Sequence, residues 1–87
     1  MNNKLDILNS MKVLEYDADG STLYYCLVAN TAENKQKLTS IGVPTEEIEE
    51  FIGIDKEDID ISGFGFSYGG AEWFDGKHGW LKEAPHE

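Results

Sequence analysis

The sequence predicts an α+β domain: a mainly antiparallel sheet of about four to five strands, with a central helical pair packed on one face and a short N-terminal helix. Three patterns support this. They are a hairpin pattern near the N-terminus, two helical patterns mid-chain, and alternating apolar residues from Asp58 to Tyr68. The 87 residues suffice for one core, and no linker or internal repeat is visible. We expect a single domain over residues 1–87, with a frayed tail at residues 82–87.

The first element expected is a short helix, with Asn3 as its N-cap. Its apolar residues recur at helical spacing: Leu5, Leu8 and Met11. The pattern leaves two alternatives for residues 5–16. The helix either ends near Ser10 and a strand follows, or it continues through Leu14.

A β-hairpin is expected from Lys12 to Ala29, with its turn at Asp17–Ser21, where Gly20 tolerates positive φ. The returning run Thr22–Ala29 is apolar on both parities, which is typical of a central strand covered on both faces or shared with a dimer partner. Asp17 and its acidic neighbours also match the first half of an EF-hand calcium loop. The closing position of that loop falls on Cys26, however, so the hairpin turn is favoured.

Two helices are expected next. Asn30 and Thr31 are candidate N-caps for a helix that ends near Ser40, and Gly42 is suited to the position after it. Pro44 then fits position N1 of a second helix, at about 45–52, or the position just before the cap of that helix. The apolar stripe of that second helix is Ile48, Phe51 and Ile52, and four glutamates cover the rest of its surface.

The stretch Asp58–Tyr68 is predicted to be a half-buried strand, with a bulge or bend at Ser62–Gly63 where the apolar parity changes. The segment Gly63–Tyr68 resembles part of the RNP1 strand of RNA-recognition motifs. Ser62 stands where that motif has Lys or Arg, and acids lie just upstream, so RNA binding is not expected. A further strand over Ala71–Phe74, a two-residue turn at Asp75–Gly76 and a returning strand over Lys77–Leu81 complete the prediction.

The net charge of −10, from 17 acidic and 7 basic residues, favours basic partners and opposes binding to nucleic acid or anionic membranes. Cys26 is the one cysteine, so no internal disulfide can form and a reducing compartment fits best. The first residues lack the apolar region of a signal peptide, and no apolar run could span a membrane. A cytoplasmic location is the expectation.

Eight of the 17 acidic residues lie in one acidic run, which is either a solvated surface or a docking surface for a basic protein face. The candidate partner-binding residues are Glu46, Glu47, Glu49, Glu50, Asp55, Glu57, Asp58 and Asp60. Four of these acids lie on the second helix of a pair with helix-turn-helix proportions. Acids there would repel phosphates, so direct nucleic-acid binding is not expected.

A second candidate site is an aromatic patch, which serves either as core or as an exposed surface for self-association. Its members are Phe64, Phe66, Tyr68, Trp73 and Trp80, with Phe74 beside them.

Catalytic signatures are weak. Pairs of Cys26 with His78, or of Ser67 with His78, are conceivable but have no local motif. His78 and His86 lack zinc-ligand spacing, and no phosphate-binding loop is present. No cofactor and no metal are expected.

The sequence therefore favours a non-enzymatic acidic binding module, an inhibitor or decoy that docks on a basic, nucleic-acid-handling protein. The alternative is an oligomeric structural or small-ligand-binding module, such as a homodimer, built on an aromatic sheet face.

Overall fold

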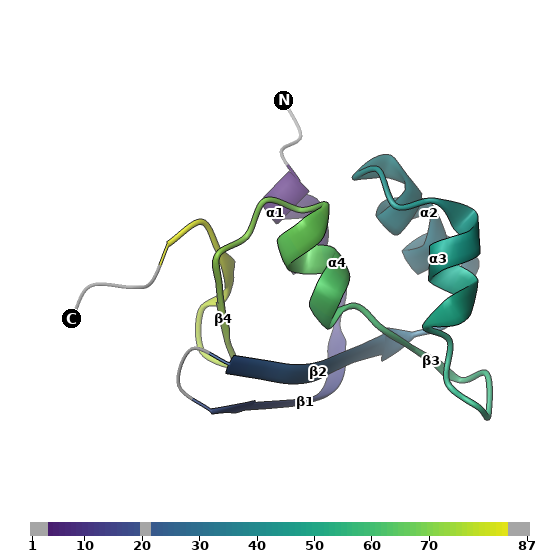
Figure 1. The fold of residues 1–87 in the computed structure, drawn as a ribbon, viewed down its shortest axis with the longest axis horizontal. Helices are drawn as coiled ribbons and strands as arrows, with labels where there is room; N and C mark the ends of the chain where they lie inside the picture. The colour runs from purple at the N-terminus through teal and green to yellow at the C-terminus, as the bar shows by residue number, and fades with distance from the viewer. Residues whose placement is uncertain (1–3, 20–21, 84–87) are drawn as a thin grey trace.

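The computed structural model describes residues 4–19 and 22–83, in two layers (Figure 1). The helices are α1 (Lys4–Asn9), α2 (Ala32–Ser40), α3 (Thr45–Glu50) and α4 (Ser62–Ser67). The strands are β1 (Val13–Asp19), β2 (Thr22–Ala29), β3 (Asp58–Asp60), β4 (Trp73–Asp75) and β5 (Gly79–Leu81). Figure 1 shows the described helices on one side of β1 and β2. The predicted α+β class is confirmed.

The strands form two antiparallel sheets, whereas the sequence predicted one. The larger sheet has the order β1-β2-β3, and β4 pairs with β5 in a separate hairpin. The cause lies in the chain after β3, where residues expected to extend that strand form α4 instead. The chain therefore leaves the sheet at Ile61, and the last hairpin packs beside α1.

Two register shifts explain why the inner face of the β1–β2 hairpin takes both odd- and even-numbered residues. Tyr16 pairs with Cys26 and Val13 pairs with Val28, so these four residues share the inner face even though their parities differ within β1. The shifts fall between Val13 and Glu15 and between Asp17 and Ala18, as expected of β-bulges. The predicted hairpin is confirmed; Gly20 and Ser21 of its turn lie outside the described residues.

The ambiguity at residues 5–16 is resolved as a helix followed by a strand. The N–H of Ser10 donates to Asp6 O (3.0 Å) and Ile7 O (3.2 Å), which closes the last turn, and β1 begins at Val13. The predicted cap, Asn3, lies outside the described residues.

The helical pair starts as predicted, but its second helix is shorter. Thr31 caps α2 by accepting a hydrogen bond from the Asn34 N–H (3.1 Å), and Gly42 follows α2 with φ of 109°. Pro44 occupies the N-cap position of α3, between the two positions predicted for it. Helix α3 ends at Glu50, two residues early, because Ile52 forms a β-bridge with Ile59 and so draws the chain toward the sheet.

The prediction of one strand over residues 58–68 is wrong beyond Asp60. The change of parity at Ser62–Gly63 marks the start of α4, where the Asp60 carboxylate accepts the Ser62 N–H (3.0 Å). On a helix, Phe64 and Tyr68 lie one turn apart, and their ring centroids are 6.2 Å apart. A helical Gly63–Tyr68 also cannot serve as an RNP1 strand.

The last hairpin has a longer loop than the two residues predicted. Asp75 pairs with Gly79, so residues 76–78 form the turn, and Gly79 adopts a φ of +77°. Glycine tolerates this left-handed conformation without the steric cost that other residues incur.

One hydrophobic core joins the inner face of the large sheet, the helices and the small hairpin. Its buried members are Leu8, Met11, Cys26, Val28, Leu38, Ile41, Val43, Ile48, Ile59, Ile61, Phe64, Ala71, Phe74 and Trp80. The outer face of the sheet carries Glu15, Leu27 and Asp60, which share that face through strand pairing.

Candidate functional site

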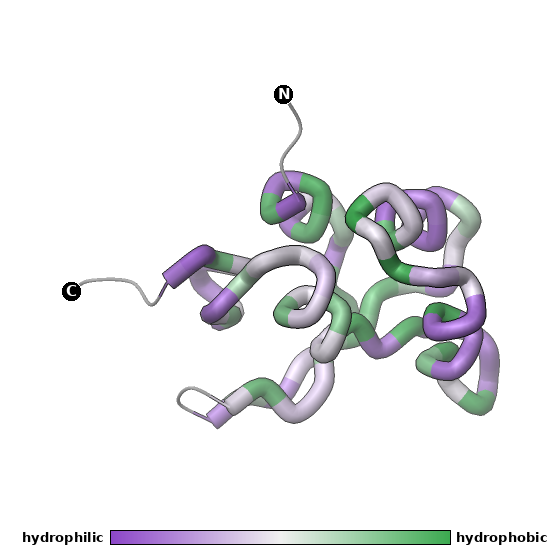
Figure 2. Tube along the Cα trace, turned by 45° about the horizontal axis from the view of Figure 1, so that its top comes forward, coloured by the Kyte–Doolittle hydropathy of each residue, from purple (hydrophilic) through white to green (hydrophobic). Residues whose placement is uncertain are grey.

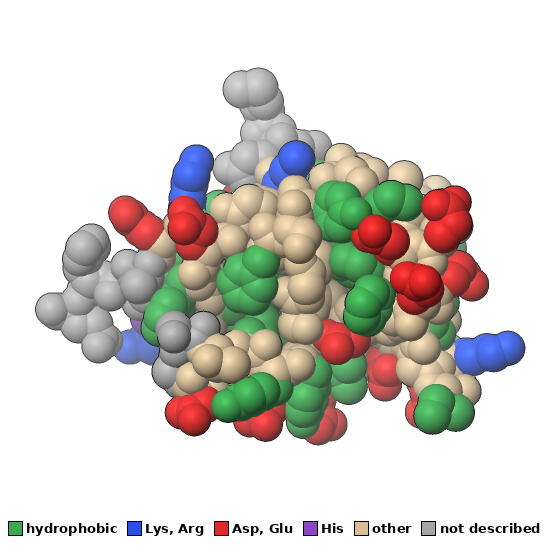
Figure 3. All heavy atoms as spheres, viewed as in Figure 1, with side chains coloured by type: hydrophobic (Ala, Val, Ile, Leu, Met, Phe, Trp, Pro, Cys, Tyr) green, Lys and Arg blue, Asp and Glu red, His purple; other side chains and the backbone are tan. Residues whose placement is uncertain are grey.

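The acidic run covers α3, the loop after it and β3, and its members differ in what they contact. Five of them are exposed: Glu46, Glu49, Glu50, Asp55 and Glu57. Glu47, Asp58 and Asp60 are half-buried. Figure 3 shows acidic side chains gathered on the right of the molecule, over the α3 end, with hydrophobic side chains between them.

Two of the half-buried acids are used inside the fold. The Glu47 carboxylate accepts a hydrogen bond from the Tyr68 hydroxyl (2.6 Å), which joins α3 to α4 and raises the pKa of that hydroxyl. The Asp60 carboxylate accepts the N–H groups of Cys26 (3.2 Å) and Ser62 (3.0 Å). These two carboxylates hold the fold together and are poor candidates for partner contact.

Lysines neutralise little of the exposed charge. Lys35 of α2 lies 3.6 Å from the Glu49 carboxylate, and both side chains are partly solvated, so this ion pair is weak. Glu46 and Glu50 form no ion pair within the described part of the chain. The exposed surface of α3 therefore keeps a net negative charge.

The loop between α3 and β3 presents an isoleucine to solvent. Ile54 is exposed over 104% of its reference area, the most of any large hydrophobic residue described. The Lys56 N–H donates to Gly53 O (2.9 Å), and the Glu57 N–H donates to the Asp55 carboxylate (3.0 Å). In Figure 2 this loop, at the far right, carries a hydrophobic stretch among hydrophilic ones.

The base of the same loop is also fixed. The Gly53 N–H donates to Asp58 O (2.9 Å), and the Asn30 side-chain amide donates to Lys56 O (3.0 Å). Lys56 adopts φ of 63°, a conformation that a non-glycine residue seldom takes without such support. Backbone hydrogen bonds thus hold Ile54 outward. Sequence reasoning missed this residue, although an apolar residue between the turn formers Gly53 and Asp55, outside any periodic pattern, is the signal that could have identified it.

The predicted aromatic patch is divided between core and surface. Phe64 and Trp80 are buried (3% and 1% exposed), while Phe66 is 37% exposed. Tyr68 and Trp73 are half-buried. Phe66 contacts the Trp80 ring edge-on with centroids 5.3 Å apart. Because Phe64 and Phe66 lie on α4 and Tyr68 is its C-cap, the aromatic sheet face assumed by the alternative function does not form.

A cleft lies at the end of the molecule opposite α3, and no sequence pattern predicts it. It has a volume of about 480 Å³ and lies between the end of α1, the first half of β1 and the β4–β5 hairpin. Apolar residues make up most of its lining, among them Met11, Val13, Phe74 and Trp80, with Glu15 and Asp75 as its charged lining residues.

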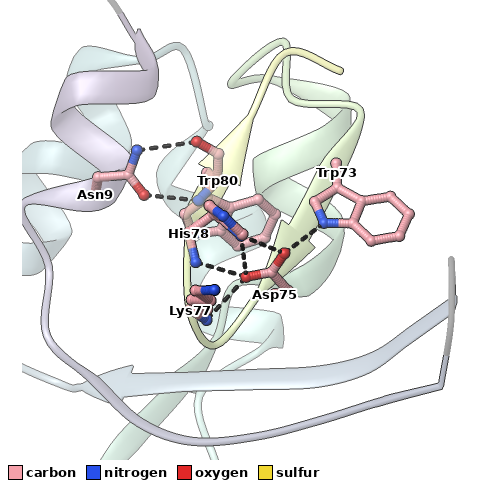
Figure 4. Close-up of polar contacts among 6 residues, drawn as sticks. All are labelled: Asn9, Trp73, Asp75, Lys77, His78 and Trp80. Carbon is pink, nitrogen blue, oxygen red and sulfur yellow. Dashed lines mark hydrogen bonds and ion pairs between the residues drawn. The ribbon is translucent and has the colours of Figure 1, made fainter. Parts of the chain in front are cut away.

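Asp75 organises the hairpin beside this cleft (Figure 4). Its carboxylate accepts hydrogen bonds from the Trp73 indole N–H (2.8 Å) and from the backbone N–H groups of Lys77 (2.8 Å) and His78 (2.5 Å). The His78 Nδ1 lies 3.0 Å from the same carboxylate. These donors, with that of Trp73 largest, hold the pKa of Asp75 far below its usual range.

Asn9 fixes the other side of the hairpin to α1 (Figure 4). Its Oδ1 accepts the Trp80 N–H (2.7 Å) and its Nδ2 donates to Trp80 O (3.0 Å). The side-chain amide thus pairs with the outer edge of β5 as a backbone strand would.

The conceivable catalytic pairs are not supported by what surrounds their members. Burial, and secondarily the charge of Asp60, raises the pKa of the Cys26 thiol to about 12, so it carries almost no thiolate at neutral pH. His78 is engaged by Asp75 within the turn. In the described ranges, no group of three or more His, Cys, Asp or Glu residues is placed to hold a metal ion.

Comparison of the chain with protein-family models, curated proteins and solved structures finds no match. Among the described residues, no helix is both long and apolar enough to cross a membrane.

Proposed function

We propose that this chain is a non-enzymatic binding module that docks through its α3 end on a basic surface of another protein. The observation that carries this proposal is Ile54, a fully exposed isoleucine held on a hydrogen-bonded loop beside unneutralised acids. Solubility accounts for acids on a surface but not for an apolar side chain fixed in water.

The two features supply different parts of a binding interaction. Glu46, Glu50 and Glu57 create a negative potential that speeds encounter with a basic surface. Burial of Ile54 in a partner's apolar socket adds about 1.5–3 kcal/mol of affinity. Phe51, 47% exposed and edge-on to Phe64, adds apolar area at the foot of the same loop.

The class of partner follows from charge. Proteins that handle nucleic acid carry the basic surfaces that an acidic module fits, and a module that occupies such a surface excludes the nucleic acid. The chain would then act as an inhibitor or decoy of that protein.

The test begins with retention of a partner from host lysate at about 0.05 M and about 0.5 M salt, a range over which screening suppresses electrostatic docking. The retained protein is purified, and its affinity for the chain is measured by calorimetry. We expect Ile54→Ser to weaken binding about tenfold or more. The double variant Glu46→Lys, Glu50→Lys should slow association and reduce its salt dependence.

Glu72→Lys is the matched control, because Glu72 is exposed and precedes β4, away from α3. The proposal fails if the double variant binds as tightly as the parent chain. It also fails if the only species retained is a second copy of the chain, in which case self-association is the function of this surface.

A further inference from the structure

The cleft beside the β4–β5 hairpin runs along the free edge of β1. Its lining includes four consecutive residues of that region, Val13, Leu14, Glu15 and Tyr16. Glu15 and Tyr16 lie beyond the register shift and point to opposite faces of the strand, so a cavity bounded by both of them lies along the strand's edge.

The same edge has unused hydrogen-bonding capacity. In the order β1-β2-β3, β1 pairs with β2 on one side only, and no described backbone group bonds to its other side. An edge of this kind accepts a further strand, as in peptide recognition by strand addition.

The cleft has the chemistry to select which segment adds there. Its interior is apolar, and its charged lining residues, Glu15 and Asp75, are both acidic. The Glu15 carboxylate accepts the Tyr25 hydroxyl (2.7 Å) and the Asp75 carboxylate accepts the donors of its turn, so both supply negative potential to the cleft, not a direct hydrogen bond to a ligand. Asp17 and Asp19 continue the negative charge along β1, and both are exposed. No lysine contributes to the lining, so an apolar side chain flanked by cations matches both the interior and the rim.

The walls are fixed before any ligand arrives. Asn9 clamps β5 to α1, and Asp75 ties the hairpin turn together through three N–H donors. Tyr16 packs edge-on against Phe74, with ring centroids 5.4 Å apart, and so joins β1 to β4. A preformed cleft spares a ligand the entropic cost of ordering the site.

We propose that this cleft binds an extended peptide segment, which adds as a strand to the β1 edge and inserts one apolar side chain between flanking basic residues. Strand β4, which borders the cleft, lies at the opposite end of the molecule from α3 (Figure 1), and the inference does not rest on the proposed function of the acidic end.

The probe is the capped peptide Thr-Lys-Thr-Leu-Thr-Lys-Thr, in which the leucine and both lysines share one face of a strand. It is titrated into the ¹⁵N-labelled full chain and followed by amide NMR. Saturable shifts are expected in β1 and the β4–β5 hairpin. The indole N–H of Trp80, buried without a hydrogen-bond partner in the described structure, supplies a separate reporter.

Changes to the peptide test each part of the proposal without altering the protein. Replacing its leucine by glycine should weaken binding about tenfold or more. Replacing both lysines by glutamate should abolish saturable shifts. N-methylation of the amides that face β1 should weaken binding about tenfold, because strand addition depends on main-chain hydrogen bonds.

A matched pair of protein variants locates the site. Leu14→Lys places a cation at the cleft and should weaken binding about fivefold or more, whereas Ile54→Lys makes the same change at the far end and should leave it unaltered. Leu14 and Ile54 are 53% and 104% exposed, so both variants should fold, which the amide spectrum checks.

The proposal is overturned by the absence of saturable shifts at millimolar peptide. It is equally overturned by binding that tolerates N-methylation, or by sensitivity to Ile54→Lys in place of Leu14→Lys. That last result would mean that the peptide binds only at the acidic α3 end, and it would support the function proposed above.

Discussion

Two alanine substitutions in α4 should change stability in opposite directions. A Cβ built on Gly65 overlaps three atoms of the Trp80 ring, the farthest of them at 2.6 Å, whereas a Cβ on Gly63 meets nothing within 4 Å. Carbon atoms in van der Waals contact lie about 3.5 Å apart or more. Gly65→Ala therefore requires the ring or the helix to move by roughly 1 Å.

The surroundings leave little room for that movement. Trp80 is 1% exposed, its ring contacts Phe74 and Phe66, and both its backbone N–H and its C=O are hydrogen-bonded to Asn9. Overpacking of a core costs about 1–3 kcal/mol, and a contact this close belongs at the upper end or beyond. Alanine recovers up to about 1 kcal/mol through helix propensity, so the net loss is about 2 kcal/mol.

Gly63→Ala gains the higher helix propensity of alanine without any overlap with Trp80, so it should stabilise the fold by about 0.5–1 kcal/mol. In a domain of this size, about 1 kcal/mol corresponds to about 4–8 °C in melting temperature. Urea unfolding followed by circular dichroism, together with thermal melts, measures both changes. If both variants changed the melting temperature equally and in the same direction, the packing of α4 on Trp80 would be refuted. If that common change were a loss of stability, it would also indicate that this segment is not a helix.

Two further predictions concern single side chains. Cys26 is fully buried and its thiol has a pKa of about 12, so it should react with a thiol reagent only at the rate of global unfolding. Urea should therefore accelerate labelling in parallel with the loss of ellipticity. Rapid labelling of the native chain would contradict the burial of Cys26. Asp75 has a folded-state pKa far below its usual range, so it contributes stability above the unfolded-state pKa of about 4 and loses that contribution as the pH falls further. Asp75→Asn should therefore be less stable than the parent chain at neutral pH, and this difference in stability should disappear on acidification. Asp19→Asn, an exposed control, should show a much smaller difference at either pH. A difference for Asp75→Asn that does not change with pH would refute the role given to the Asp75 carboxylate.

The sequence predicted the fold well where local signals were unambiguous and poorly where tertiary packing decided. The turn chemistry between Asp17 and Ser21 and the cap at Thr31 correctly located the first hairpin and α2. The alternation of glycine and phenylalanine after Ser62 indicates a strand, because nothing local at Gly65 favours a helix. Its role, to let the Trp80 ring approach the helix axis, depends on a residue far along the chain.

The same limit applies to the candidate site. The acidic run was identified from composition, but its division into buried and free carboxylates depends on contacts with Tyr68, Lys35 and the Cys26 backbone. The cleft had no counterpart in the sequence, because its walls come from β1, α1 and the C-terminal hairpin. For Ile54 the sequence does hold a local signal of exposure, because this apolar residue lies between the turn formers Gly53 and Asp55.

The division among the carboxylates decides which variants can report on binding. Asp60 and Asp75 each accept at least two backbone N–H groups, so reversing either charge would leave those donors unsatisfied and lower the stability of the fold. Such a variant would lose binding for a reason unrelated to any interface. Glu46 and Glu50 accept no such bonds among the described residues, so reversing them leaves no backbone donor unsatisfied, and a loss of affinity at unchanged stability reflects the partner. An acid-reversal series that weakens binding in proportion to lost stability would thus argue against docking at α3, and one that weakens binding at constant stability would argue for it.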